Sequence, residues 1–436
     1  MTKKNYLWFW MLALPVLGNA QDTLSISKSD LLAKLTDKNL QIKIAQQAYQ
    51  GALADYQSSN SLFLPSITAS HTGISTTNPL MAFGSKLNQA ILTPADFNPA
   101  LLNNPVRTQN FATTIEVLQP IINVDGLYGR QAAKAKTNAF LLQTQRTQEY
   151  VEFEVNKAFM QLQMAYQAVT VMQKALEVAQ ANGVLINNYF NQGLVQKTDV
   201  LMVDVRINEL KNQLQMAKSN VQNASDYLAF LLNEDTKNKV YKPNQSLAVE
   251  SLASASNISL SDNRKDIQAM NLSVQAYKKM WQSAQMNFLP RLNAFGSYQM
   301  YDAQIFQTSA KGYLVGAQLS WNVFDGYKSI GKNQKAKADY LKADAESQQY
   351  KAQSNLELKK TTRQLTDLED KVTTSQLAWQ QSQEVFRIRT NRFKQGLEKT
   401  TDVLAAETQM VFKNLEYLQS VFEYNTTKDY LGFLTK

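Results

Sequence analysis

A nine-residue phrase that occurs twice is the feature that most constrains this chain. Residues 193–201 and residues 396–404 share the pattern Gly-Leu-x-x-x-Thr-Asp-Val-Leu. Two other landmarks recur in the same order, a Phe-Leu-Pro triplet at residues 63–65 and 288–290 and an Asp-Gly pair that comes after each of them. The repeat is far longer than the units of a solenoid, so it indicates one duplication and not an array.

The duplication predicts how the chain is organised. Residues 21–232 form the first structural repeat, residues 263–436 form the second, and residues 233–262, rich in Asn, Ser and Lys, connect them. Residues 1–20 resemble a secretory signal peptide, with two lysines, an apolar run and small residues at the cleavage-determining positions, which predicts cleavage after Ala20. An uncleaved anchor is the alternative, and the apolar run is short for a bilayer span.

Two long stretches without Gly or Pro predict helices well beyond the usual globular length. They cover residues 131–182 and 332–395. Apolar residues in steps of four and three predict a coiled-coil seam in residues 151–179, again in residues 203–231, and in a weaker form in residues 358–386.

Between the landmarks the apolar period changes from 3.5 to two, which predicts strands. The candidates are Ser66–Ile74, Asn110–Leu118, Arg291–Tyr301 and Gly312–Phe324. About ten alternating residues with aromatics are typical of tilted strands in a membrane barrel, and a soluble two-hairpin sheet is the alternative. Four strands leave two unpaired edges, so a barrel in lipid requires several copies of the chain.

The first hairpin is the longer of the two, because it holds an additional segment, Asn78–Arg107. That segment contains three Asn-Pro pairs. Such pairs are turn signals, so they predict a long surface loop, which a barrel would place outside the cell.

Composition argues against several other classes of protein. The chain has no cysteine, which excludes thiolate metal sites, and its single histidine, His71, nearly excludes histidine-based metal sites or catalysis within one chain. No motif combines a nucleophile, a base and an orienting group, so we expect no enzyme and no cofactor. The net charge of +9 is spread along the helices among acidic residues, which argues against nucleic acid as a partner.

Taken together, these landmarks resemble those of the TolC-like outer-membrane efflux proteins. Residues 118–123 and 319–326 look like the strand-to-helix passages of that family, and the Gly-Leu phrases look like its helix-to-helix turns. The resemblance covers essentially the whole mature chain, and the duplicated order of the motifs is its most specific part.

The resemblance implies an α+β membrane protein built from duplicated halves, each with a strand hairpin and long helices. Three chains with four strands each would form a twelve-stranded β-barrel in outer-membrane lipid, continued by a long periplasmic α-helical coiled-coil tunnel. It further implies a homotrimer in a Gram-negative outer membrane that works with a periplasmic adaptor and an inner-membrane pump. Such a channel passes small molecules or secreted polypeptides, and the alternative is a secreted periplasmic coiled-coil stalk without a pore.

The resemblance also implies residues for the tip of the tunnel. Thr198 and Asp199 match one side of its constriction, Phe393 stands where a tyrosine is often found, and Asp402 matches an acidic position at the entrance. Glu398 departs from the pattern, since it replaces an expected latch arginine and would repel Asp199 if the two faced each other. Ala405 departs as well, at a position where a second pore aspartate is expected; a cation for the latch could come from Lys197, Lys399 or Arg392.

The turns themselves are expected to dock the adaptor, through Gly193 and Leu194 in the first half and Gly396 and Leu397 in the second. Capping alone is the alternative. In that case the two glycines would be left-handed helix caps, and the Thr-Asp pairs at 198–199 and 401–402 would be N-caps of the next helices.

Overall fold

The computed structural model describes residues 23–237, 239–250 and 259–436, which fall into two compact units. The predicted signal peptide, residues 1–20, lies outside the described residues. The first unit, here called the helical unit, takes Met1–Lys43, Gln148–Ile258 and Leu358–Leu434, and the second, the strand unit, takes Ile44–Thr147, Ser259–Glu357 and Thr435–Lys436. Each unit therefore contains residues from both predicted sequence repeats. The division of the chain into two repeats with a connector stays a prediction.

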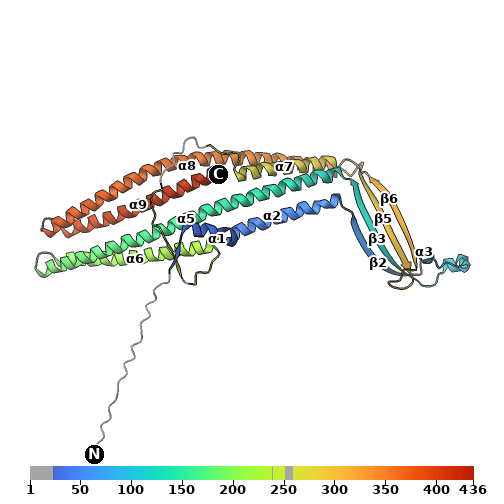
Figure 1. The fold of residues 1–436 in the computed structure, drawn as a ribbon, viewed down its shortest axis with the longest axis horizontal. Coiled ribbons are helices and arrows are strands. Elements are labelled where there is room, and N and C mark those ends of the chain that lie inside the picture. The colour runs from blue at the N-terminus through green and yellow to red at the C-terminus, as the bar shows by residue number, and fades with distance from the viewer. Residues whose placement is uncertain (1–22, 238, 251–258) are drawn as a thin grey trace, which may run out of the picture. The chain divides into compact units, whose positions relative to one another are not determined.

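The strand unit contains a four-stranded antiparallel sheet in the order β2-β3-β5-β6 (Figure 1). The strands are β2 (Ser66–Thr76), β3 (Thr108–Ile122), β5 (Arg291–Asp302) and β6 (Ala310–Ser320). All four predicted strands are present, but the last one was predicted to continue to Phe324 and ends at Ser320 instead. Its partner β5 begins at Arg291, directly after Pro290, which has no N–H to extend the ladder, so residues 321–324 have no strand beside them.

The two faces of this sheet differ in polarity. Residues on one face alternate with residues on the other, so the register assigns each side chain to a face. One face is mainly apolar and carries Ile67, Ala69, Ile115, Val117, Ala294, Tyr298, Met300, Tyr313 and Val315. The other is mainly polar and carries Thr68, Ser70, Thr72, Thr114, Glu116, Asn293, Ser297, Gln299 and Gln318.

The segment Asn78–Arg107 is not the plain loop that was predicted. It contains α3 (Pro79–Asn88), a 3₁₀ helix (Pro94–Phe97) and α4 (Pro99–Asn103). Both α-helices begin at a proline, and the asparagine before each proline caps the helix: Asn78 Oδ1 accepts from the Met81 N–H at 3.2 Å, and Asn98 Oδ1 from the Ala100 N–H at 3.0 Å. Two of the three Asn-Pro pairs that looked like turns are thus N-cap and first-turn pairs, and the third, Asn104-Pro105, comes directly after α4.

The helices account for most of the chain. Those of the helical unit are α1 (Lys28–Lys38), α6 (Lys197–Leu231) and, except for its last residue, α9 (Thr400–Thr435). Helix α7 (Lys265–Met286) belongs to the strand unit. Three further helices contribute a segment to each unit: α2 (Leu40–Ser58), α5 (Val124–Asn191) and α8 (Lys328–Lys394). Among the described residues, none of the helices combines the length and the apolar character needed to cross a membrane.

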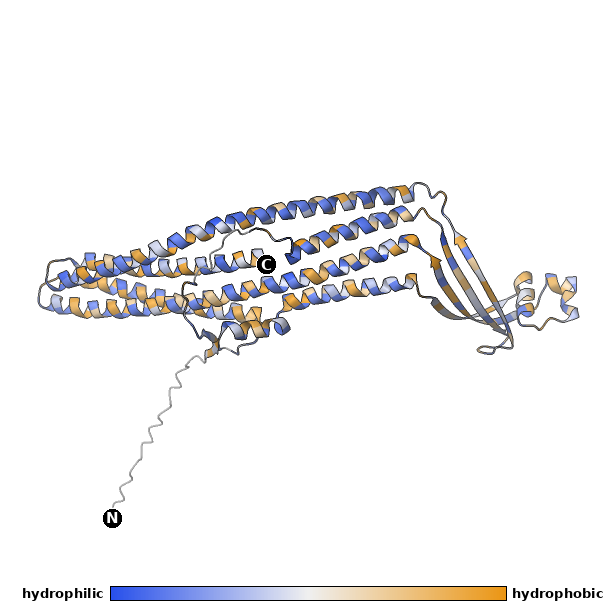
Figure 2. Ribbon diagram, turned by 45° about the horizontal axis from the view of Figure 1, so that its top comes forward, coloured by the Kyte–Doolittle hydropathy of each residue, from blue (hydrophilic) through white to orange (hydrophobic). Residues whose placement is uncertain are grey.

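The predicted coiled-coil seams are confirmed by burial. Every seam residue of α5 from Val151 to Ala179 is buried except Val169, and every seam residue of α6 from Val203 to Leu231 is buried except Ile207; both exceptions are half-buried. Apolar residues lie at intervals among polar ones along these helices, as expected for narrow seams (Figure 2). In the helical unit, a short parallel pair of strands, β1 (Thr23–Ile26) and β4 (Val240–Pro243), packs on this core.

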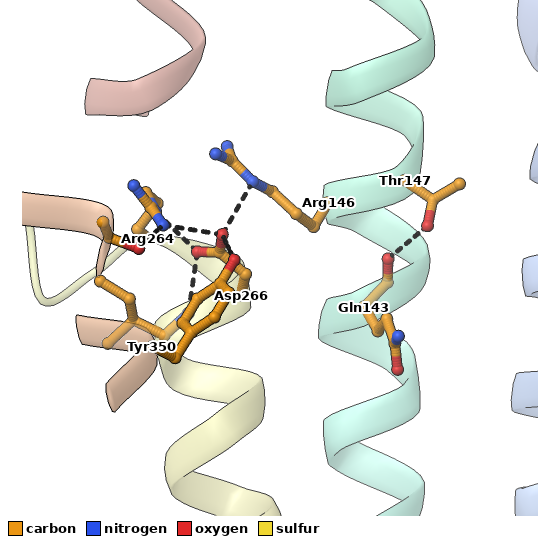
Figure 3. Close-up of polar contacts among 8 residues, drawn as sticks. Gln143, Arg146, Thr147, Arg264, Asp266 and Tyr350 are labelled. Atoms are coloured by element: carbon orange, nitrogen blue, oxygen red, sulfur yellow. Dashed lines mark hydrogen bonds and ion pairs between the residues drawn. The ribbon is translucent and has the colours of Figure 1, made fainter. Parts of the chain in front are cut away.

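A buried ionic cluster joins α5, α7 and α8 within the strand unit (Figure 3). The carboxylate of Asp266 accepts from Arg264 Nε at 2.7 Å and from the Tyr350 hydroxyl at 2.6 Å, and Arg146 Nε lies 3.3 Å away. Arg264 also donates to Ser354 Oγ at 2.8 Å. Arg146 and Arg264 are buried, so this carboxylate holds two arginines inside the helix packing.

Candidate functional site at the two helix turns

The two Gly-Leu phrases form identical helix-ending turns in the helical unit. After α5, the Gly193 N–H donates to Phe190 O at 2.9 Å and the Leu194 N–H donates to Tyr189 O at 2.9 Å. These two bonds define a Schellman motif, and Gly193 has φ +73°, a left-handed conformation that favours glycine.

The turn after α8 repeats this geometry. The Gly396 N–H donates to Phe393 O at 2.9 Å, the Leu397 N–H donates to Arg392 O at 3.0 Å, and Gly396 has φ +73°. Both glycines are therefore left-handed helix caps, as the capping interpretation expected.

The leucine of each turn is exposed. In a Schellman motif this residue frequently packs back on its own helix. Here Leu194 remains 66% exposed and Leu397 62% exposed. Each turn consequently presents one large apolar side chain outward, which capping alone does not require.

The N-cap prediction for the aspartates and threonines is wrong. Gln196 is the N-cap of α6, and Asp199 is the third residue of that helix, where its Oδ2 accepts from the Gln196 N–H at 3.0 Å. Thr198, exposed at the second position, lies 3.4 Å from Gln196 Oε1. Thr401 and Asp402 are likewise the second and third residues of α9. Each helix thus begins two or three residues earlier than a Thr or Asp N-cap would require.

Glu398 belongs to an ionic network within the second turn. Its two carboxylate oxygens lie 2.9 Å from Arg389 Nη1 and 2.9 Å from Arg392 Nε, and Arg389 Nη1 also lies 3.7 Å from Asp402 Oδ1. Arg392, one of the three cations that the sequence offered, makes this contact, and Arg389 was missed. Three arginines between residues 387 and 392, just before the turn, were the available signal. Glu398 thus pairs with arginines of its own hairpin, in place of the repulsion from Asp199 that the sequence suggested.

The two copies of the phrase differ where Val195 in the first corresponds to Glu398 in the second. Val195 packs against the apolar cluster at the turns, whereas Glu398 bonds to arginines. One turn is therefore secured by apolar contact and the other by ion pairs.

Phe393 holds the two turns side by side. It is buried in a cluster that takes residues from α5, α6, α8 and α9, namely Ile186, Val200, Val203, Phe393 and Val403. Its ring packs on Tyr189, with centroids 5.8 Å apart. The cluster takes residues from the helices on both sides of each turn, so the two turns share one apolar core.

A buried ion pair that the sequence analysis missed links α6 to α9 behind this core. Arg206 Nε lies 2.8 Å from Glu407 Oε2, and Arg206 Nη2 lies 3.2 Å from Glu407 Oε1. The side chain of Arg206 is 9% exposed and that of Glu407 is 1% exposed. This two-bond arrangement is the strong geometry for Arg with a carboxylate. No local pattern marks two charges so far apart in sequence as partners.

Comparison with solved structures finds a similar overall fold. A membrane protein from Pseudomonas aeruginosa has a TM-score of 0.81 and 16% identity, and the match covers 94% of this chain and 92% of that one. The CmeC outer membrane channel of Campylobacter jejuni has a TM-score of 0.81 and 17% identity, with 94% of this chain and 85% of that one covered. The open state of the MtrE outer membrane channel of Neisseria gonorrhoeae has a TM-score of 0.77 and 14% identity, with 94% of this chain and 88% of that one covered. No curated protein matches the sequence.

The sequence also matches a family model over most of its length. The model describes outer membrane efflux proteins, and it matches residues 31–234 and 259–426. These ranges include both Gly-Leu turns, all four strands of the sheet and the long helices. The chain therefore belongs to the outer membrane efflux protein family.

Proposed function

We propose that three copies of this chain form the outer-membrane exit channel of a tripartite export system. The observation that carries the proposal is the four-stranded sheet with one apolar face, one polar face and two edge strands, β2 and β6. Edges exposed to lipid would leave backbone groups unpaired, and pairing β2 of one copy with β6 of the next removes every edge. Three sheets closed in this way make a twelve-stranded barrel with its apolar face toward lipid.

The other parts of the system are proposed from membership of an efflux family. A stalk or scaffold without a pore is not supported, since the chain belongs to a family of efflux proteins. The helices would continue the barrel as a periplasmic tunnel that meets an adaptor and an inner-membrane pump. The pump would supply the energy and select small molecules or polypeptides as cargo. We assign no enzymatic activity to the chain.

The proposed assembly and location are tested by fractionation. We expect the protein in the outer-membrane fraction, running as a trimer in mild detergent, with a mature N-terminus at Gln21 after cleavage behind Ala20. A soluble periplasmic monomer would exclude the channel.

The turns are proposed as the adaptor-docking site and the tunnel-tip constriction. Leu194 and Leu397 would insert into the adaptor, and Gly193 and Gly396 would set their position. Around them, Thr198, Asp199, Phe393, Glu398 and Asp402 would form or support the constriction. In support, the leucines are exposed and the acidic residues lie in the first turns of α6 and α9 or just before them.

Removing both leucines is expected to weaken docking strongly while leaving the fold intact. Burying a leucine side chain contributes roughly 1.5–3 kcal/mol. A Leu194→Ser, Leu397→Ser variant should therefore bind the adaptor with an affinity lower by at least about tenfold, and cells that carry it should lose export. Co-purification of the adaptor and resistance of cells to an exported compound measure the two effects.

A matched control removes two leucines that are equally exposed elsewhere. Leu341 and Leu356 lie exposed on α8 outside the turns, so Leu341→Ser, Leu356→Ser should retain adaptor binding and export. Full export by a trimeric Leu194→Ser, Leu397→Ser variant would leave the turns with a capping role alone.

A further inference from the structure

The segment between β2 and β3, Asn78–Arg107, is an ordered unit, here called the insert. Its helix α3 is fixed to the sheet by Gln89, which is buried and donates to Gln109 O and Asn110 Oδ1, each at 2.8 Å. The Phe83 and Phe97 rings meet edge to face with centroids 5.6 Å apart. Lys86 Nζ lies 2.7 Å from Asp96 Oδ1, and that hydrogen bond, with those from Thr93, lowers the pKa of Asp96 to about 2. The insert is thus held together by its own ring contact and ion pair, and hydrogen bonds attach it to the sheet.

The outward side of the insert is apolar. On α3, Ala82 and Ser85 face inward and are buried, while Leu80 on the other side is 81% exposed. The apolar face of a helix normally packs against the rest of its own protein. The exposed apolar side chains of the insert are Leu80, Met81, Leu87, Ile91, Phe97, Leu101 and Val106. No described residue of the same chain covers these side chains.

The charges of the insert argue against a membrane surface as the cover. Lys86, Asp96 and Arg107 are its only charged residues in sequence. Lys86 is paired with Asp96, and Arg107 Nε donates to Ser75 Oγ at 2.7 Å, so both cations are engaged within the chain. Helices that lie on a membrane instead present Lys and Arg to anionic headgroups. The composition therefore suits an apolar protein surface.

The position of the insert points to another copy of the same chain. The insert begins directly after β2, an edge strand, and its helices lie beyond the end of the sheet (Figures 1 and 2). In the proposed trimer, β2 borders β6 of the next copy, so each insert would start at a seam between two copies. The β5–β6 turn reaches the same end of the sheet and exposes Ile305 and Phe306. The apolar surface is thus continuous with the proposed interface.

We infer that the inserts of the three copies pack against one another through the exposed side of α3 and form an apolar cap over the outward mouth of the barrel. This inference rests on the proposed trimer. The cap would form a barrier at the exit, separate from the constriction at the helix turns, and export would require the inserts to part.

Disulfide trapping tests the contact, and the chain suits it because it has no cysteine of its own. Leu80→Cys and Leu87→Cys, two turns apart on the exposed side of α3, should each give cross-linked pairs of chains under mild oxidation in outer membranes. Asn103→Cys, at an exposed polar position on α4, is the matched control and should cross-link several-fold less. Export by the oxidised Leu87→Cys channel should fall several-fold and recover with dithiothreitol.

The outcomes separate this inference from the proposed function. A trimer that forms but cross-links no better at Leu87→Cys than at Asn103→Cys overturns the contact, and quenching of a bimane label at that cysteine by spin-labelled lipid would then identify lipid as the cover. Cross-linking without loss of export overturns the barrier. Absence of any trimer overturns the proposed channel itself.

Discussion

Replacing Glu407 with alanine is expected to destabilise the folded chain by about 3–5 kcal/mol. The substitution leaves the guanidinium of Arg206 buried between α6 and α9 without the carboxylate that now lies 2.8 Å from its Nε. Removing a charge from water is costly, and only its partner offsets that cost. Glu209, exposed and 3.4 Å from Arg206 Nη1, can compensate for little of the loss.

The thermal unfolding midpoint of the detergent-solubilised protein, followed by helical circular dichroism, measures this effect. The double variant Arg206→Met, Glu407→Leu should recover most of the midpoint, because an apolar pair of similar size avoids the desolvation cost. Glu416→Ala is the control: Glu416 pairs with Lys413 on the same surface of α9, and its loss should cost about 0.5 kcal/mol or less. Equal midpoints for Glu407→Ala and wild type would show that the pair contributes nothing.

The position of this pair gives it a second consequence. It joins α6, which comes after the first Gly-Leu turn, to α9, which comes after the second. Closer to the turns, the shared core around Phe393 joins these two helices and also takes residues from α5 and α8. Any movement that separates the two helix hairpins must therefore break a buried ion pair as well as apolar contacts, so the pair would resist opening of the proposed tunnel tip.

Local patterns predicted the features of the fold that depend on local physics. The seam of α5, the strand alternation and the left-handed glycines arise from periodicity and backbone sterics, and the structure has all three. The helices of the insert were missed because an Asn-Pro pair has the same local chemistry in a turn as at a helix start. The residues just after the pair distinguish the two cases: Asn78-Pro79 leads into a run of good helix formers, Leu80 to Ala82.

The ionic contacts depend on tertiary structure, and sequence patterns could not predict them. In the sequence, Arg206 lies beside the seam positions of α6 and therefore resembles an exposed polar residue that flanks a coiled-coil seam. Its partner Glu407 lies in the other half of the chain. The same holds for Arg146 and Asp266. At the turns, the resemblance to a family suggested the positions of Glu398 and Asp402, but the arginines that neutralise Glu398 became apparent only from the geometry of the turn.

The second large effect is expected at Asp266 in the buried cluster of Figure 3. Asp266→Ala should destabilise the chain by about 3–5 kcal/mol, because it leaves Arg264 and Arg146 buried without their shared carboxylate. Tyr350→Phe removes a single hydrogen bond to that carboxylate and should cost about 1.5–3 kcal/mol. The unfolding midpoint of the detergent-solubilised protein ranks the two variants against wild type.

The same cluster predicts a dependence on pH. Burial opposes ionisation of Asp266, but hydrogen bonds from Arg264 and Tyr350 and the charge of Arg146 outweigh it and lower its pKa. Because the folded pKa lies below the unfolded value of about 3.9, the carboxylate stabilises the fold fully above that value, and this contribution is lost as pH falls through the folded pKa. Wild type should therefore lose stability below about pH 4 more steeply than Asp266→Asn does. The control is Asp344→Asn, at a partly exposed site on α8, which should lose stability as steeply as wild type does. Unfolding midpoints between about pH 3 and 7 measure the slopes, and parallel curves for wild type and Asp266→Asn would contradict the role of this carboxylate.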